Sequence, residues 1–310
     1  MGKILIVGAG ISGILLAKEF VLAGLQVEIW EKSNGVGGRM ATRRGDGTSW
    51  DHGAQFYTPD GLLLKYHRMW LDQNLVKPWP FPTEKPRYYS TLGMNALAKN
   101  LCTDLTIHKN RRLCKLVKNN SQWYAEDEQQ QSSYYNEVYL TCPLPQSLIL
   151  LEKNSLEFSN SLRNIIYSKS IVALISSKIE LPEIAFYKED PNTSFFSWVD
   201  MKAKGLSKFP AWTIVANSKW SEEYWELTES LILENFKNEV SKFFLLKKFP
   251  ESEWQIKKWY YSQPLKTISS QEGFISKNPN LMITGDAFGG GSIAGAARAA
   301  QLTFSDRLKL

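Results

Sequence analysis

The chain has 310 residues, of which 43% are hydrophobic and 22% are charged, a composition typical of a globular protein with a sizeable core. Its formal charge of +6 comes from 37 Lys and Arg against 31 Asp and Glu, and the lysines are spread along the sequence, which argues against nucleic-acid binding. The three cysteines have spacings that match neither a zinc site nor a redox pair, so we predict free thiols in a reducing compartment and no bound metal.

Membrane insertion and secretion are also disfavoured. The best candidate for a membrane span, Ile11–Ala23, is interrupted by Lys18 and Glu19 and is shorter than the roughly 20 apolar residues that a span requires. A predicted strand follows Met1 almost directly, without the basic and apolar segments of a leader peptide. We therefore predict a cytoplasmic protein with no membrane partner.

The first predicted elements form a parallel crossover unit. Lys3–Val7 is a short run rich in β-branched residues, which predicts a strand buried on both faces of a sheet. Ile14–Ala23 has the hydrophobic period of a helix and ends before Gly24. Gln26–Trp30 predicts the second strand, so that strand, helix and strand follow one another as in a βαβ unit.

A glycine fingerprint lies in the turn between the first strand and the helix. Gly8, Gly10 and Gly13 follow the GxGxxG spacing, in which the glycines permit the turn, the approach of a pyrophosphate and close helix packing. The helix start directs free N–H groups at the phosphates, and Glu31, after the second strand, suits the ribose hydroxyls. The pattern predicts a dinucleotide site without separating NAD from FAD. The alternative is a turn that binds nothing.

A second glycine-rich segment, Gly35–Met40, follows the predicted ribose acid closely. Its backbone donors and Arg39 could stabilise a diphosphate, which favours FAD, and the alternative is a flexible loop with incidental basic residues. The stretch Ser33–Asp60 has the period of neither regular element, so we expect an irregular but ordered loop.

Further elements are predicted along the rest of the chain. Helices are expected at Gly93–Leu101, Ser221–Phe244 and Ile293–Leu308. Strands are expected within Asp104–Asp127, with a hairpin turn at Asn119–Ser121, and at Glu137–Thr141 and Leu281–Thr284. Between Leu151 and Ile268 the sequence becomes rich in aromatic residues, which marks a candidate second domain.

Several motifs resemble those of the renalase-like branch of the FAD-dependent amine oxidase superfamily. The resemblance is carried by Gly37-Gly38-Arg39-Met40-Ala41-Thr42 and by Asp51-His52-Gly53-Ala54-Gln55-Phe56-Tyr57-Thr58. Further landmarks are Gly93–Leu97, Pro143–Gln146, Lys258-Trp259, Ser262-Gln263 and Gly285-Asp286. The likeness is strong in the first part of the chain and patchy between Leu151 and Ile256.

The resemblance implies an α/β fold in which a mixed-sheet α+β substrate domain is inserted into a Rossmann-type FAD-binding domain. The FAD-binding domain is predicted to comprise residues 1–75, 90–155 and 268–310, and the substrate domain residues 76–89 and 156–267. The predicted FAD-binding residues are Gly8, Gly10, Ile11, Ser12, Gly13, Glu31, Lys32, Gly38, Arg39, Met40, Ala54, Gln55, Phe56, Gly285, Asp286 and Ile293. Of these, Gln55 and Phe56 are expected near the isoalloxazine ring.

The substrate side is less sharply defined by the sequence. Trp198, Lys258, Trp259 and Tyr260 are the candidates, because aromatic rings beside a flavin could sandwich a nicotinamide-like or amine substrate. For each aromatic residue, core packing is the alternative. The chain departs from close relatives at Lys257-Lys258 and at Ser292-Ile293-Ala294, so the substrate is less firmly predicted than the cofactor.

The predicted activity is hydride transfer from a small substrate to flavin N5, with O2 reoxidising the flavin. The resemblance implies an aberrant dihydro-NAD(P) isomer as that substrate. The alternatives are an amine oxidase, a desaturase of isoprenoid type, which should show a long apolar funnel that we do not find, and a non-catalytic flavin-binding redox sensor.

Overall fold

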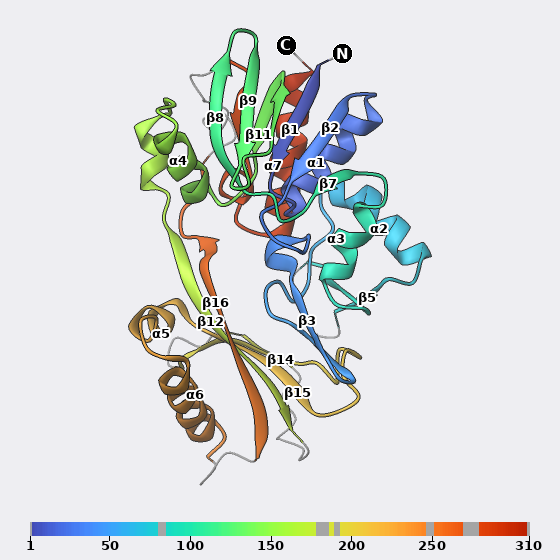
Figure 1. Ribbon diagram of the computed structural model, residues 1–310. Coiled ribbons are helices and arrows are strands. Elements are labelled where there is room, and N and C mark those ends of the chain that lie inside the picture. The colour runs from blue at the N-terminus through green and yellow to red at the C-terminus, as the bar shows by residue number, and fades with distance from the viewer. Residues whose placement is uncertain are drawn as a thin grey trace.

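A computed structural model describes residues 2–79, 85–177, 193–245, 251–268 and 279–308, together with the backbone of residues 186–188. The predicted segment 76–89 therefore lies partly outside the described residues. The two five-stranded sheets occupy opposite ends of the molecule, and the long strands β12 (Tyr167–Ser177) and β16 (Ser252–Pro264) extend from the lower sheet toward the upper one (Figure 1). The structure thus has two lobes, one built around each sheet.

The first lobe contains a parallel sheet with the strand order β17-β11-β1-β2-β7. Its strands are β1 (Lys3–Val7), β2 (Gln26–Trp30), β7 (Thr106–His108), β11 (Glu137–Leu140) and β17 (Leu281–Ile283). Alternate residues of β1 enter two different cores, because successive side chains of a strand point to opposite faces. Ile4 and Ile6 pack toward the helices, whereas Leu5 packs on the other face.

Helices and a small sheet cover the two faces of the parallel sheet. One face carries α1 (Ile11–Leu22), α7 (Ile293–Arg307) and α3 (Asn95–Leu101), with α2 (Leu62–Asp72) beside α7. The other face carries α4 (Leu144–Lys153) and the antiparallel strands β8 (Leu113–Asn119), β9 (Gln122–Asp127) and β10 (Ser132–Tyr135). This layered arrangement confirms the predicted Rossmann-type fold, including the hairpin turn at residues 119–121.

The second lobe contains an antiparallel sheet with the order β13-β14-β15-β12-β16. The remaining strands are β13 (Phe186–Lys188), β14 (Phe195–Asp200) and β15 (Ala211–Ala216), and α5 (Ser218–Glu223) and α6 (Glu229–Phe243) cover one face. Ile171, Ala173 and Ile175 of β12 pack toward these helices. Val172 and Leu174 instead join the core of the first lobe, so the two lobes share one continuous apolar core.

The expectation of an irregular loop at Ser33–Asp60 is wrong in part. Besides a 3-10 turn at Gly38–Met40, this segment contains an antiparallel hairpin of β3 (Thr42–Gly45) and β4 (Thr48–Asp51). The turn is made by residues 46 and 47, where Gly47 has a φ of +65° that favours glycine. A second short hairpin pairs β5 (Val76–Pro78) with β6 (Tyr88–Ser90), and 3-10 turns lie at Asn160–Asn164 and Asp286–Phe288.

The helix predicted at Ser221–Phe244 is in fact two helices. Helix α5 ends at Glu223, and Thr228, whose backbone is extended, precedes α6. The ammonium of Lys258 on β16 donates to the carbonyls of Trp225 (2.5 Å) and Leu227 (3.4 Å) in the connection. These two carbonyls therefore have a hydrogen-bond donor although the connection between α5 and α6 is not helical.

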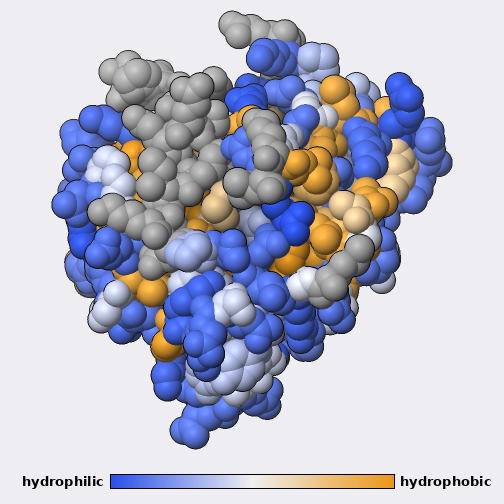
Figure 2. Space-filling view, turned by 90° about the horizontal axis from the view of Figure 1, so that it is seen from above, coloured by the Kyte–Doolittle hydropathy of each residue, from blue (hydrophilic) through white to orange (hydrophobic). Residues whose placement is uncertain are grey.

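Seen from above, the surface is mainly hydrophilic, with hydrophobic residues in separate patches (Figure 2). Within the described ranges, none of the helices combines the length and the apolar character needed to cross a bilayer.

Candidate functional site

The fingerprint glycines occupy the turn from β1 to α1 in the way their spacing predicts. Gly8 has a φ of +108°, and a Cβ atom on Gly13 would lie 2.2 Å from the carbonyl oxygen of Gly8. Gly13 thus allows α1 to pack directly on the turn. A Cβ atom on Gly10, in contrast, would meet nothing within 4 Å. The backbone at Gly10 therefore borders open space, as a site for a bound diphosphate requires.

The start of α1 offers hydrogen-bonding groups to that open space. The first N–H groups of an α-helix have no acceptor within the helix. In α1 the capping residue, Gly10, has no side chain that could accept from them. Ser12 is 4% exposed, and within the described residues its hydroxyl has no hydrogen-bond partner. A buried hydroxyl beside free N–H groups fits a phosphate acceptor. Ile11, by contrast, is buried in the core.

Glu31 lies beside the same turn. It is 8% exposed, and its two carboxylate oxygens accept hydrogen bonds of 2.8 Å from the backbone N–H groups of Ala9 and Ser33. A carboxylate has about four acceptor positions, so capacity remains for ribose hydroxyls. Lys32 points elsewhere, because its ammonium lies 3.3 Å from the side-chain oxygen of Gln146 at the surface.

The second glycine-rich segment lies against the first. The N–H of Gly37 donates to the carbonyl of Ala9 at 2.8 Å, and a Cβ atom on Gly38 would lie 3.5 Å from the Cα atom of Gly10. Met40 is buried in the core. The predicted diphosphate-binding residues of the two segments are thus brought together, although their contacts with FAD remain a prediction.

Arg39 forms an ion pair that links the two ends of the chain. Its guanidinium donates to both carboxylate oxygens of Asp286, at 2.7 and 2.8 Å, and to the carbonyl of Ser262 at 3.0 Å. The hydroxyl of Tyr167 also donates to Asp286, at 3.0 Å. Asp286 follows β17, whereas Tyr167 and Ser262 are carried there by the long strands β12 and β16. The Arg39 side chain is only half-buried; desolvation opposes the shift, but the charge of Asp286 and its hydrogen bond raise the pKa of Arg39.

Asp286 also begins the approach to α7. Gly285 has a φ of +133°, and the backbone N–H groups of Gly290 and Gly291 donate to the carbonyl of Asp286 at 3.2 and 2.9 Å. Ile293 is the first residue of α7, and its side chain packs against the main core. The predicted residues Gly285, Asp286 and Ile293 therefore form one strand-to-helix turn facing Arg39.

The turn that contains Gln55 and Phe56 is packed against Arg39. A Cβ atom on Gly53 would lie 1.9 Å from the carbonyl oxygen of Arg39, and the N–H of Ala54 donates to that oxygen at 2.9 Å. Gln55 is 7% exposed, and the ring of Phe56 lies 4.2 Å from the Arg87 guanidinium carbon. The predicted flavin-facing turn, residues 53–56, is thus fixed to the Gly38–Met40 segment.

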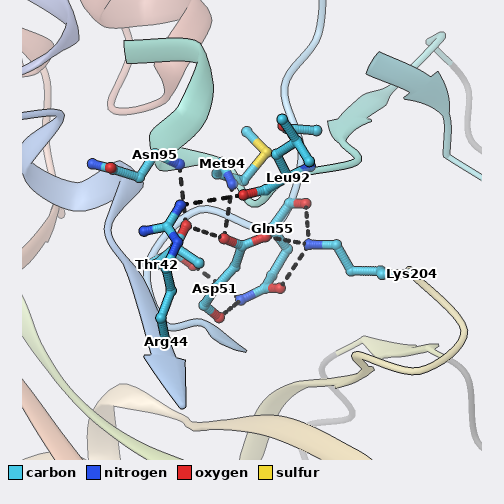
Figure 3. Close-up of polar contacts among 10 residues, drawn as sticks. Thr42, Arg44, Asp51, Gln55, Leu92, Met94, Asn95 and Lys204 are labelled. Atoms are coloured by element: carbon cyan, nitrogen blue, oxygen red, sulfur yellow. Dashed lines mark hydrogen bonds and ion pairs between the residues drawn. The ribbon is translucent and has the colours of Figure 1, made fainter. Parts of the chain in front are cut away.

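A buried ion pair beside this turn could not be predicted from the sequence. The ammonium of Lys204 lies 2.7 Å from a carboxylate oxygen of Asp51, and their side chains are 3% and 0% exposed. Figure 3 shows how Lys204 reaches from the second lobe to Asp51 and Gln55. No motif marked Lys204, since lysine is rarely buried and its partner lies 153 residues away in sequence.

The structure separates the predicted substrate-side residues. Trp198 on β14 is fully buried among Trp212, Phe243 and Phe244, and β15 and β12 lie between β14 and β16. Lys258 and Tyr260 of β16 both lie against Trp225. Because alternate residues of a strand face opposite ways, Trp259 points to the other face, toward the first lobe. Trp259 is therefore the candidate that the structure brings to the cofactor motifs.

Trp259 stacks on His52, a residue of the same motif as Gln55. The two rings lie 5.4 Å apart at an angle of 19°, and the indole N–H donates to the carbonyl of His52 at 2.7 Å. Burial lowers the pKa of His52 to about 4, and the positive charges of Lys257 and Arg43 act in the same direction while Asp51 opposes them. His52 is thus neutral at pH 7, in surroundings with positive potential.

Comparisons with known proteins agree with this geometry. Residues 6–68 match the NAD(P)-binding Rossmann-like domain. The chain is 21% identical to mouse renalase over 321 aligned positions, which cover 93% of each protein.

Two solved structures share the fold over 99% of both chains. The first is a putative protoporphyrinogen oxidase from Exiguobacterium sp. 255-15, with a TM-score of 0.78 and 13% identity. The second is a putrescine oxidase variant redesigned in its cofactor binding, with a TM-score of 0.72 and 14% identity. The chain is thus similar to mouse renalase along almost its whole length, and it shares the fold of these two oxidases around a Rossmann-like NAD(P)-binding domain.

Proposed function

We propose that the protein oxidises a small dihydronicotinamide substrate, a dihydro-NAD(P) isomer, and passes its electrons to O2. Bound FAD supplies the hydride acceptor for such a reaction. In the net reaction the substrate loses a hydride, which is one proton and two electrons, and becomes NAD(P)+. O2 takes up this hydride and one proton from solvent and becomes hydrogen peroxide. The homology to renalase extends through the second lobe, where this substrate is expected to bind.

The residues of the chain have distinct roles in this proposal. Ser12 and the first N–H groups of α1 bind the diphosphate of FAD, and Glu31 binds its ribose. Arg39 and Asp286 hold the two ends of the chain together around the cofactor. Trp259 and His52 provide a flat apolar wall that orients the substrate ring and excludes water.

The observation that carries the choice of substrate is the charge beside that wall. Lys257 lies on the same face of β16 as Trp259, and Lys257 and Arg43 are close enough to His52 to lower its pKa. Asp51, the nearby acid, is neutralised by Lys204. A protonated amine would be repelled here, whereas a substrate carrying a pyrophosphate would be attracted. This argument favours the dinucleotide over the amine that the fold of putrescine oxidase would suggest.

Anaerobic mixing of the yellow holoenzyme with candidate donors tests the proposal. Dihydro-NAD(P) isomers should bleach the absorbance of oxidised flavin within seconds, primary and secondary amines should not, and admitted air should restore the colour with formation of hydrogen peroxide. Bleaching by amines alone would support an amine oxidase. Bleaching by neither class would support a redox sensor without turnover.

A charge-reversal variant tests the substrate argument directly. Lys257→Glu should slow reduction by the dinucleotide isomer roughly tenfold or more at low salt and should leave reduction by the corresponding dihydronicotinamide riboside, which lacks phosphate, unchanged. Lys219→Glu, on the exposed side of α5, changes the net charge equally and serves as the control. Equal slowing by both variants would contradict the proposal.

A further inference from the structure

The Lys204 ammonium is a cation of the second lobe that is buried inside the first. Lys204 lies in the turn at residues 201–206 between β14 and β15, and its side chain is 3% exposed. Besides Asp51, the ammonium contacts the rings of Trp79 and Tyr89, at 5.7 and 5.6 Å from their centroids. Burial of this kind lowers the pKa of Lys204, and the charge of Asp51 opposes the shift.

The Lys204 ammonium has more hydrogen-bond acceptors than the one on Asp51 that would suffice to pair the two charges. The ammonium donates to Asp51 at 2.7 Å, to the backbone carbonyl of Gln55 at 3.0 Å and to the side-chain carbonyl of Gln55 at 3.4 Å. All three of its N–H donors are therefore used, and two of the three acceptors belong to Gln55. The amide nitrogen of Gln55 in turn donates to the carbonyls of Asp51 (2.5 Å) and Gly53 (3.3 Å).

Asp51 connects this network to the rest of the first lobe (Figure 3). Its second carboxylate oxygen accepts hydrogen bonds from the hydroxyl of Thr42, at 2.5 Å, and from the backbone N–H of Met94, at 2.8 Å. The position of Asp51 is thus fixed by β3 and by the residue before α3. Replacing a buried ion pair with apolar groups is often neutral or favourable for stability, so stability alone gives no reason for this lysine.

We propose that Lys204 is a positioning residue for the turn at residues 53–56. This role rests on the function proposed above. Lys204 fixes both carbonyls of Gln55 relative to the second lobe, where the substrate is expected to bind. It thereby fixes the turn that is predicted to face the flavin. Its loss displaces the turn without removing the proposed phosphate- and ribose-binding residues, which lie in the β1–α1 turn and after β2. FAD binding is therefore retained, while the environment of the flavin ring and the alignment of the substrate change.

Two variants separate positioning from simple neutralisation of charge. Lys204→Met alone leaves Asp51 buried without a counter-charge and could prevent folding. The double variant Lys204→Met with Asp51→Asn removes both charges together, and the asparagine oxygen can still accept from Met94. Ser207→Ala is the matched control, because it removes a hydrogen bond between the lobes, to the hydroxyl of Thr48 at 2.9 Å, from the same connection but away from Gln55.

The holoproteins are compared by FAD content, melting temperature, absorption spectrum and midpoint potential, the last with a chemical reductant. The double variant is expected to retain FAD and the wild-type melting temperature, to show shifted flavin bands and potential, and to be reduced by substrate 10- to 100-fold more slowly. Ser207→Ala is expected to match the wild type in all of these.

Three results would overturn the inference. They are a wild-type spectrum and potential in the double variant, an equal shift in Ser207→Ala, and failure of the double variant to fold or to hold FAD. The last result would instead assign Lys204 to holding the lobes together. Because the spectrum and the potential need no substrate, the inference can be judged even if the donor proposed above proves wrong.

Discussion

Alanine at Gly10 should weaken FAD binding and alanine at Gly13 should weaken the fold, although both residues belong to the same fingerprint. Gly10 has φ and ψ of −73° and 171°, which alanine adopts without strain, and its Cβ atom would meet no protein atom within 4 Å. Alanine is a poorer helix cap than glycine, but it also restricts the unfolded chain, so the two effects offset each other within about 1 kcal/mol. The apoprotein should therefore melt at nearly the wild-type temperature.

The same methyl group would occupy the space assigned to the diphosphate. Overpacking costs about 1 to 3 kcal/mol, which corresponds to a loss of roughly 5- to 150-fold in FAD affinity, since 1.4 kcal/mol is tenfold. In Gly13→Ala the Cβ atom would instead lie 2.2 Å from the carbonyl oxygen of Gly8 and 2.6 Å from the hydroxyl of Thr141. That change should cost the fold about 3 kcal/mol and lower the melting temperature by several degrees.

Titration of each apoprotein with FAD, followed by quenching of flavin fluorescence, measures the affinities, and differential scanning fluorimetry without FAD measures stability. Normal FAD affinity in Gly10→Ala would refute the placement of the diphosphate. An equally stable Gly13→Ala variant would refute the argument from close packing of α1.

Three further predictions address the carboxylate, the guanidinium and the histidine of the site. Glu31→Gln keeps a single acceptor oxygen, and hydrogen bonds to charged groups contribute about 1.5–3 kcal/mol. FAD titration should therefore show at least roughly tenfold weaker binding, and unchanged affinity would contradict the assignment of Glu31 to the ribose. Arg39→Lys cannot bind both oxygens of Asp286, so the apoprotein should melt at a lower temperature, and an unchanged melting curve would show that the pair contributes nothing. The pKa of His52 is lowered from 6.5 to about 4 in the folded protein, so the unfolded state binds more protons between these values and the free energy of unfolding should fall by up to about 3 kcal/mol as the pH drops from 6.5 to 4. Denaturant titrations at several pH values should show a shallower loss in His52→Gln, and identical slopes would count against the lowered pKa.

Strands and helices could be predicted where the hydrophobic period of a short segment follows from its burial. The strands at Lys3–Val7 and Gln26–Trp30 and the helix between them could be predicted because their hydrophobic periods follow from burial on a parallel sheet. The hairpin of β3 and β4 was missed because its first strand, Thr42–Gly45, has no buried residue and hence no alternation. The residues Asp46 and Gly47 between the strands were the available signal, since this pair is typical of tight hairpin turns.

Contacts between distant segments could not be predicted in this way. Lys204 lies in a polar turn whose sequence suggests exposure, and its burial depends on Asp51 and on the rings of Trp79 and Tyr89, which are distant in sequence. Similarly, the sequence offered Trp198 and Trp259 as equivalent candidates, and only the strand order of the second sheet separates them. The residue boundaries of the two domains stay a prediction, because Val172 and Leu174 pack in the same core as Ile4 and Ile6.

The order of the strands in the first sheet has a consequence for synthesis of the protein. Strand β1 pairs with β11, and β11 pairs with β17 at residues 281–283, shortly before Asp286 in the sequence. The second sheet uses residues 167–264 and can assemble while the ribosome is still translating. The edge of β11 therefore has no partner until residues 281–283 have been made, and a product terminated before them would display that edge to chaperones and proteases.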